Sequence, residues 1–165
     1  MIDPKMVGAA EKKIEDENVR FRSFLKNNVD SDELDGHFAA FHEELFASFD
    51  CRSCCNCCRS SDTVLTENDI KRIAAFLGVS QEQWIKDCGI SKDEDGDLII
   101  SAPCKLLLAN GECSVEKVKP QTCREFPHTN KPNRMASLLG ILAAASVCPI
   151  VFEILERLKK VYGFR

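Results

Sequence analysis

Five cysteines within eight residues constrain this chain more than any other feature of its sequence. The segment reads Cys51-Arg52-Ser53-Cys54-Cys55-Asn56-Cys57-Cys58. Two residues between thiolates let the backbone turn so that both sulfurs reach one metal, and three sulfurs at such steps resemble the start of ferredoxin cluster motifs. Adjacent side chains usually diverge, so we expect Cys57 and Cys58 to point to different centres, or one of them to a shared edge. The segment predicts a thiolate metal site.

The cellular compartment decides whether clustered cysteines are expected to bind a metal or to form disulfides. Residues 1–5 have neither the cationic nor the apolar region of a secretory signal, so we expect a cytoplasmic protein. In a reducing cytoplasm, clustered thiols are more often metal-binding or catalytic than disulfide-bonded. The uncharged run from Met135 to Phe152 has the length of a short membrane span. It is rich in small residues and interrupted by Pro149, so we expect a buried helix and no membrane partner.

The length and net charge of the chain limit the classes of molecule that it is expected to bind. The chain has 165 residues, which suits one compact domain, and a net charge of −4, which argues against nucleic-acid binding. Residues 1–50 contain no cysteine and carry 6 basic and 12 acidic side chains, a net charge of −6. We expect this part to be a helical pair packed on residues 51–165, the cysteine-cluster region. This helical pair is a candidate interface for a homodimer or for an unidentified protein partner.

The hydrophobic pattern predicts a mainly α fold: a small helical domain with one short β-hairpin, organised around a cysteine-ligated metal centre. Apolar residues recur at helical spacing, and capping residues such as Thr66 and Ser80 mark helix starts. The predicted helices cover residues 5–28, 31–49, 67–77, 81–88, 120–124, 134–147 and 150–162. A strand is predicted at 98–100, and a hairpin at 106–115 around the turn Asn110-Gly111.

The other cysteines fall at predicted irregularities of the backbone. Cys104 follows Pro103 at the entrance of the hairpin, and Cys113 lies just beyond its turn, so the two arms would bring these thiols together. Cys123 follows Pro120, and Cys148 stands before Pro149 at a helix break. Cys88 is four residues after Trp84 on one helix and is expected to pack beside it as a small hydrophobe.

Several separated blocks together carry a family resemblance. They are Cys51-x2-Cys54-x2-Cys57-Cys58, Leu65-Thr66-x2-Asp69-Ile70, Cys104, Gly111-x-Cys113 and Lys119-Pro120-x2-Cys123-Arg124-x-Phe126-Pro127. This pattern resembles the YkgJ-like cysteine-cluster family, described as a zinc- or iron-chelating domain with a CxxCxxCC signature. It covers about residues 49–150. The flagellin lysine N-methylase proteins resemble the same cysteine pattern.

The resemblance implies eight metal ligands. They are Cys51, Cys54, Cys57, Cys58, Cys104, Cys113, Cys123 and Cys148. Cys55 and Cys88 are left as spares, and His128 is an alternative to Cys148. The chain departs from the family at a few positions: Cys55 stands where the family has Gly-like small residues, Lys105-Leu106-Leu107 where it has Pro-Phe-Leu, Glu116 near its Tyr, and Lys119 where it has Arg.

Four classes of function remain open from the sequence. Eight thiolates could hold two four-ligand centres, and soft thiolates suit iron–sulfur clusters and zinc alike. The first reading is an iron–sulfur or mononuclear iron protein that is redox-linked. The second is a structural zinc module for protein interaction. The third, implied by the resemblance, is an accessory to an N-methylase-like activity. The fourth is a thiol-disulfide oxidoreductase, for which Cys51-Arg52-Ser53-Cys54 has the CxxC form but lacks a βαβ context. The sequence has no GxGxxG nucleotide loop, so it names no catalytic residue.

Overall fold

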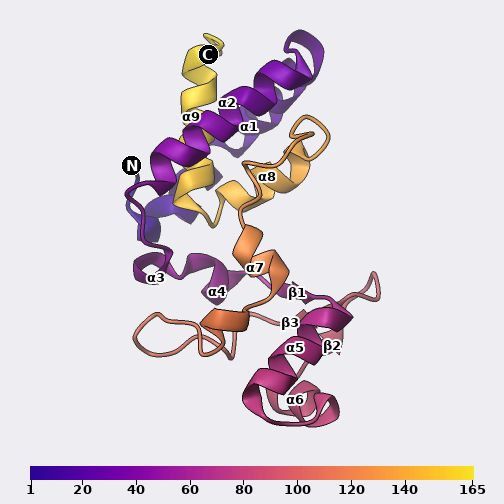
Figure 1. Cartoon of the computed structure of the whole chain (residues 1–165). Coiled ribbons are helices and arrows are strands. Elements are labelled where there is room, and N and C mark those ends of the chain that lie inside the picture. The colour runs from indigo at the N-terminus through magenta and orange to yellow at the C-terminus, as the bar shows by residue number, and fades with distance from the viewer. The chain divides into compact units, whose positions relative to one another are not determined.

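The computed structural model describes residues 1–165 and confirms the mainly α prediction (Figure 1). The elements group into two compact units. Unit 1 contains residues Met1–Asp50 and Pro127–Arg165, and unit 2 contains Cys51–Phe126. Residues 127–165 therefore group with residues 1–50, whereas the sequence placed them with the cysteine region.

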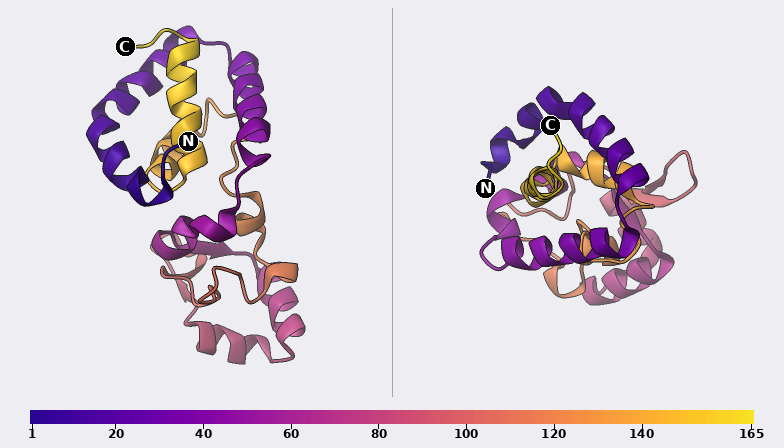
Figure 2. Two further views of the ribbon diagram at one scale, coloured as in Figure 1. Left: turned by 90° about the vertical axis from the view of Figure 1, so that its left-hand side faces the viewer. Right: turned by 90° about the horizontal axis from the view of Figure 1, so that it is seen from above.

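Unit 1 is built from four helices. They are α1 (Val7–Asn28), preceded by a 3-10 turn η1 (Pro4–Met6), α2 (Ser31–Phe46), α8 (Leu138–Ala145) and α9 (Pro149–Val161). The left view of Figure 2 shows α9 between α1 and α2. Apolar side chains from these helices, including Phe21, Phe38 and Ile154, are fully buried there. Removing such surface from water stabilises the unit by about 25 cal/mol per Å².

Caps and ion pairs fix the ends and edges of these helices. The Asp30 carboxylate caps α2 by accepting the N–H groups of Asp32 and Glu33. The buried Lys159 ammonium on α9 lies 2.7 Å from Glu17 of α1 and 2.7 Å from Glu156. This paired charge ties α1 to α9.

The apolar run near the C-terminus forms two helices with a sharp break. α8 and α9 are bent by 117° relative to each other, and Pro149 is the first residue of α9. No single helix has the length and apolar character to span a membrane, while the bent pair meets both criteria only when its two helices are taken together. Leu138, Ile141 and Ala145 are buried, so one face of α8 belongs to the core of unit 1.

Unit 2 combines short helices with a small sheet. The helices are α3 (Cys51–Cys54), α4 (Asn56–Ser60), α5 (Glu67–Leu77), α6 (Gln81–Cys88), the 3-10 turn η2 (Glu116–Val118) and α7 (Gln121–Glu125). The strands β1 (Thr63–Leu65), β2 (Ser91–Lys92) and β3 (Leu98–Ile100) form an antiparallel sheet in the order β1-β3-β2. The strand at 98–100 is confirmed, and its two partners were not predicted.

The predicted hairpin at 106–115 is present as a short, irregular one. Its arms pair at an antiparallel bridge between Leu107 and Cys113, flanked by the Leu108 N–H donating to the Glu112 carbonyl and the Ser114 N–H donating to the Leu106 carbonyl, both at 2.8 Å. The Asn-Gly turn is closed by the Gly111 N–H donating to the Leu108 carbonyl. Leu106 and Val115 turn inward to the apolar core of unit 2, together with Trp84 and Cys88. The segment is therefore a minimal hairpin anchored by core contacts, and the three-stranded sheet β1-β3-β2 is separate from it.

Candidate metal centre

The cysteine-dense segment folds into two short helices with a break at Cys55. This residue has φ 54° and ψ 15°, the left-handed conformation that side chains with a Cβ rarely adopt. The break ends α3 and lets α4 begin in a new direction, with Cys57 and Cys58 in its first turn. A left-handed backbone explains why a Gly-like residue suits this position.

The buried Cys55 thiol connects this segment to the turn at 108–111. Its Sγ donates to the Arg52 carbonyl at 2.9 Å and lies 3.4 Å from the Gly111 carbonyl. Gly111 itself has φ +86°, and a Cβ there would collide with the Arg52 carbonyl oxygen. The two backbones can approach this closely only because residue 111 is glycine.

Cys57 and Cys58 lie closer together than the sequence suggested. Their Sγ atoms are 4.0 Å apart, so the expected divergence of these neighbours is not seen. A tetrahedral site with metal–sulfur bonds of about 2.3 Å has sulfur–sulfur edges of roughly 3.8 Å. The pair is therefore spaced as two ligands of one centre, or as a shared edge, would be.

Cys104 is joined to Cys58 through the backbone. The Cys104 N–H donates to the Cys58 carbonyl at 2.7 Å, which fixes the entrance of the 104–115 segment against α4. Burial raises the pKa of the Cys104 thiol, and the Cys58 thiolate raises it further. Burial likewise raises the pKa of Cys113, and there Cys104 adds to the effect. Cys58, Cys104 and Cys113 thus lie near enough for their charges to interact.

The Cys123 thiol, on α7, lies near the same cysteines. Its Sγ lies 3.8 Å from the Thr63 Oγ1 on β1. Desolvation of the thiol raises its pKa to about 11, and the nearby Cys104, Cys58 and Cys113 thiolates push in the same direction. Cys104, Cys113 and Cys123 thus resist ionisation, a situation that a bound cation relieves.

Cations stand beside these sulfurs. The pKa of Cys58 is lowered to about 6, chiefly by its hydrogen bond with Cys57; burial opposes this, while Lys119 and Arg59 favour the thiolate. Lys119 is held at 2.8 Å from the Glu116 carboxylate. Positive side chains of this kind offset the excess negative charge of a thiolate centre.

Asp69 and Arg72 on α5 hold the backbone that leads to Cys123. Asp69 is 1% exposed; burial alone would raise its pKa, but hydrogen bonds from Thr66, Gln121 and Arg72 lower it. Its carboxylate accepts the Gln121 N–H at 3.2 Å and Arg72 Nη2 at 2.6 Å. Arg72 also donates to the Lys119 carbonyl at 2.9 Å. We call this arrangement the Asp69–Arg72 clamp.

The predicted ligands fall into three groups. Cys57, Cys58, Cys104, Cys113 and Cys123 are linked by the contacts and charge interactions above, and we call them the Cys58 group. Cys51, exposed, and Cys54, buried, stand at the two ends of α3. Burial raises the pKa of the Cys54 thiol and Cys58 adds to the effect, so Cys54 lies beside the Cys58 group. Cys148 is buried in unit 1, before Pro149, and His128 also belongs to unit 1.

Cys88, one of the two cysteines outside the predicted ligand set, lies in a packed apolar environment. No disulfide joins any of the ten cysteines. Cys88 lies in the apolar core of unit 2 with Trp84, where burial raises the pKa of its thiol. The Asp69–Arg72 clamp was not identified from the sequence, although Asp69 belongs to the Leu65–Ile70 block that carried the family resemblance.

The donor chemistry of the Cys58 group fits zinc or iron, since several thiolates surround one another within unit 2. No three Cys, His, Asp or Glu side chains are already at the spacing of a formed metal site. A metal would therefore draw the sulfurs together by movements of side chains on these short helices and turns.

A comparison with protein families agrees with this chemistry. Residues 50–149 match the family described as "CxxCxxCC: Putative zinc- or iron-chelating domain". The match covers more than half of the chain, so the chain belongs to this family. No curated protein and no solved structure matches the chain significantly.

Proposed function

We propose that this member of the CxxCxxCC family holds zinc or iron through the thiolates of the Cys58 group. One observation carries the proposal: the Cys57 and Cys58 sulfurs lie 4.0 Å apart on α4, and the Cys104 N–H donates to the Cys58 carbonyl at 2.7 Å, so that the 104–115 segment meets the cysteine segment at this pair.

Several residues of this protein favour a metal at the Cys58 group, each in a different way. The Cys57–Cys58 pair supplies two sulfurs at 4.0 Å, and the Cys104 N–H fixes a third thiol beside them. Lys119 and Arg59 favour the Cys58 thiolate. A bound metal would replace the thiol protons and join the three segments, so its binding energy would stabilise unit 2.

The identity of the metal decides the finer function. An iron–sulfur cluster would support the redox-linked role, because its iron can exchange electrons. Zinc has no redox chemistry and would make the chain a structural module for a protein partner. More sulfurs are present than one tetrahedral ion needs, because the Cys58 group has five thiols and α3 adds Cys51 and Cys54, and this surplus favours a multinuclear centre.

The test is to purify the full chain without oxygen and to measure its zinc, iron, acid-labile sulfide and visible absorption. Iron with matching sulfide and a brown colour would establish the redox-linked form. A colourless protein with stoichiometric zinc would establish the structural form. A folded protein with neither metal, after reconstitution with each, would overturn the proposal.

Paired variants test the ligand assignment. Cys58→Ser should lose most of the metal, because Cys58 connects the other sulfurs of the group. Cys88→Ser is the matched control, because Cys88 lies in the apolar core beside Trp84, and it should keep the wild-type metal content. Equal metal content in the two variants would show that the Cys58 group is not the centre.

A further inference from the structure

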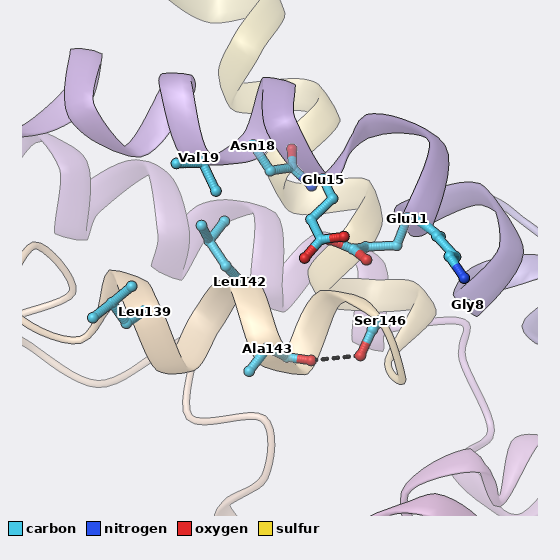
Figure 3. Close-up of a pocket in the computed structure, with 10 residues that line it drawn as sticks. Gly8, Glu11, Glu15, Asn18, Val19, Leu139, Leu142, Ala143 and Ser146 are labelled. Atoms are coloured by element: carbon cyan, nitrogen blue, oxygen red, sulfur yellow. Dashed lines mark hydrogen bonds between the residues drawn. The ribbon is translucent and has the colours of Figure 1, made fainter.

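Unit 1 contains a pocket that metal binding does not use. It has a volume of about 460 Å³ and lies between α1 and α8, in the size range of small-ligand pockets, roughly 300–1,000 Å³. Ten residues line it: Gly8, Glu11, Lys12, Glu15, Asn18, Val19, Leu139, Leu142, Ala143 and Ser146. In Figure 3 the side chains of Glu11 and Glu15 extend from α1 toward α8, where Leu142 faces them.

One buried polar residue of this pocket, Asn18, lacks the hydrogen-bond partners that buried groups normally have. Asn18 is 1% exposed, and neither its Oδ1 nor its Nδ2 has a hydrogen-bond partner. Glu11 is 9% exposed, and Glu15 is exposed. Leaving a buried amide unpaired costs about 1–3 kcal/mol. Such an arrangement on the core-facing side of α1 indicates a site whose partner is a ligand.

The other wall of the pocket is apolar. Leu142 and Ala143 belong to α8, and Val19 and Leu139 stand at the same pocket with 52% and 65% of their surfaces exposed. Exposed aliphatic side chains beside two carboxylates match a molecule with a cationic head and an aliphatic stem. We propose that this pocket binds an alkylammonium group, with the ammonium between Glu11 and Glu15 and the stem along Leu142 and Leu139.

No lysine of the chain already occupies the proposed ammonium position between Glu11 and Glu15. Lys12 is the one basic residue of the lining; it is exposed and forms no ion pair with either carboxylate. Lys159, the buried lysine of this unit, pairs instead with Glu17 and Glu156. The lining therefore keeps a net charge of −1 from two acids and one base. An ammonium donates three hydrogen bonds, enough for both carboxylates and the Asn18 oxygen.

The alkylammonium can come from a free amine or from a lysine side chain, and one titration distinguishes them. Amide chemical shifts of the full, metal-containing chain are followed by NMR during addition of n-pentylamine or of Nα-acetyl-lysine N-methylamide. Pentanol and Nα-acetyl-norleucine N-methylamide are controls that keep the stem and lack the charge. Saturable shifts confined to α1 and α8 are expected with the amines only. Binding of both amines identifies a lysine site, and binding of pentylamine alone identifies a free-amine site.

Variants of α1 test the proposed contacts. The double change Glu11→Gln and Glu15→Gln should weaken amine binding at least about tenfold, because it removes two charge-assisted hydrogen bonds. Asp16→Asn removes a charge from the exposed side of the same helix, outside the pocket, and should change binding less than about twofold. Asn18→Leu should raise the melting temperature of the ligand-free chain while weakening binding, since it replaces an unpaired amide by an apolar group. Absence of saturable binding, equal binding of the neutral analogues, or equal effects of the two charge changes would overturn the proposal.

Discussion

Arg72 donates through Nη2 to the Oδ1 of Asp69 at 2.6 Å, and the two side chains together hold the backbone between Lys119 and Gln121. Cys123 follows two residues later on α7. A helix that supplies no ligand therefore positions one thiol of the Cys58 group.

Replacing Asp69 by Asn should weaken unit 2. An amide cannot accept all the hydrogen bonds of the buried carboxylate and carries no charge to pair with Arg72, so we expect a loss of about 2 kcal/mol in the free energy of unfolding. Urea unfolding followed by Trp84 fluorescence measures it. Glu67→Gln, an exposed change on the same helix, should cost less than about 1 kcal/mol. If both variants lose the same stability, the clamp does not stabilise unit 2.

The same carboxylate should give unit 2 a dependence on acid. Hydrogen bonds lower the pKa of Asp69 in the folded state despite its burial, so its contribution is complete above its unfolded pKa, near 3.9. That contribution is lost as the pH falls through the lower, folded pKa. Unfolding free energies measured from neutral pH into this acidic range should fall more steeply for the wild type than for Asp69→Asn. Parallel curves would exclude Asp69 as the source.

Gly111→Ala should separate the 108–111 turn from the cysteine segment. Gly111 has φ +86°, and a Cβ there meets the Arg52 carbonyl oxygen and lies 3.2 Å from the Cys55 Sγ. Backbone strain and overpacking together predict a loss of about 2–4 kcal/mol. Gly36→Ala in α2 is the control, because no atom lies within 4 Å of the added Cβ; it should stabilise the chain by up to about 1 kcal/mol. Thermal unfolding of both variants measures these changes. If Gly111→Ala leaves the stability unchanged, the close approach of Gly111 to the Arg52 carbonyl is contradicted.

Two changes at Cys55 separate its backbone role from its thiol role. Cys55→Gly and Cys55→Ala both remove the bonds to Arg52 and Gly111, but only glycine relieves the left-handed backbone at φ 54°. The glycine variant should be about 1 kcal/mol more stable than the alanine variant. Both should keep the wild-type metal content. Loss of metal in both would make Cys55 a ligand and shift the motif by one residue.

Local patterns predicted most of the helices correctly because each rule acts over a few residues. Thr66 and Asp69 form the reciprocal cap that starts α5, and Ser80 caps α6. The hairpin at 106–115 was found because its Asn-Gly turn is a local signal, although its arms pair at only one bridge. β1 was missed because its three residues are defined only by pairing with β3, which lies far away in the sequence.

The sequence could identify the thiols of the site but not their grouping. Spacing within residues 51–58 indicated ligands, while the approach of Cys104 to Cys58 depends on a backbone hydrogen bond between segments 46 residues apart. The expected divergence of Cys57 and Cys58 failed because both lie in the first turn of α4, where their sulfurs meet at 4.0 Å. Whether Cys148 is a ligand stays a prediction.

Removing the metal should affect the two units differently, and the chain contains a separate fluorophore for each. Its single tryptophan, Trp84, lies in the core of unit 2, and its single tyrosine, Tyr162, packs near Phe24 in unit 1. Because the metal would join the three segments of the Cys58 group, a chelator should lower the thermal midpoint reported by Trp84 by at least about 10 °C. The midpoint reported by Tyr162 should move little, since unit 1 has its own core. No shift in either probe would contradict a stabilising metal. Equal shifts would show that unit 1 also depends on the metal, and Cys148, its only cysteine, would be the residue to replace.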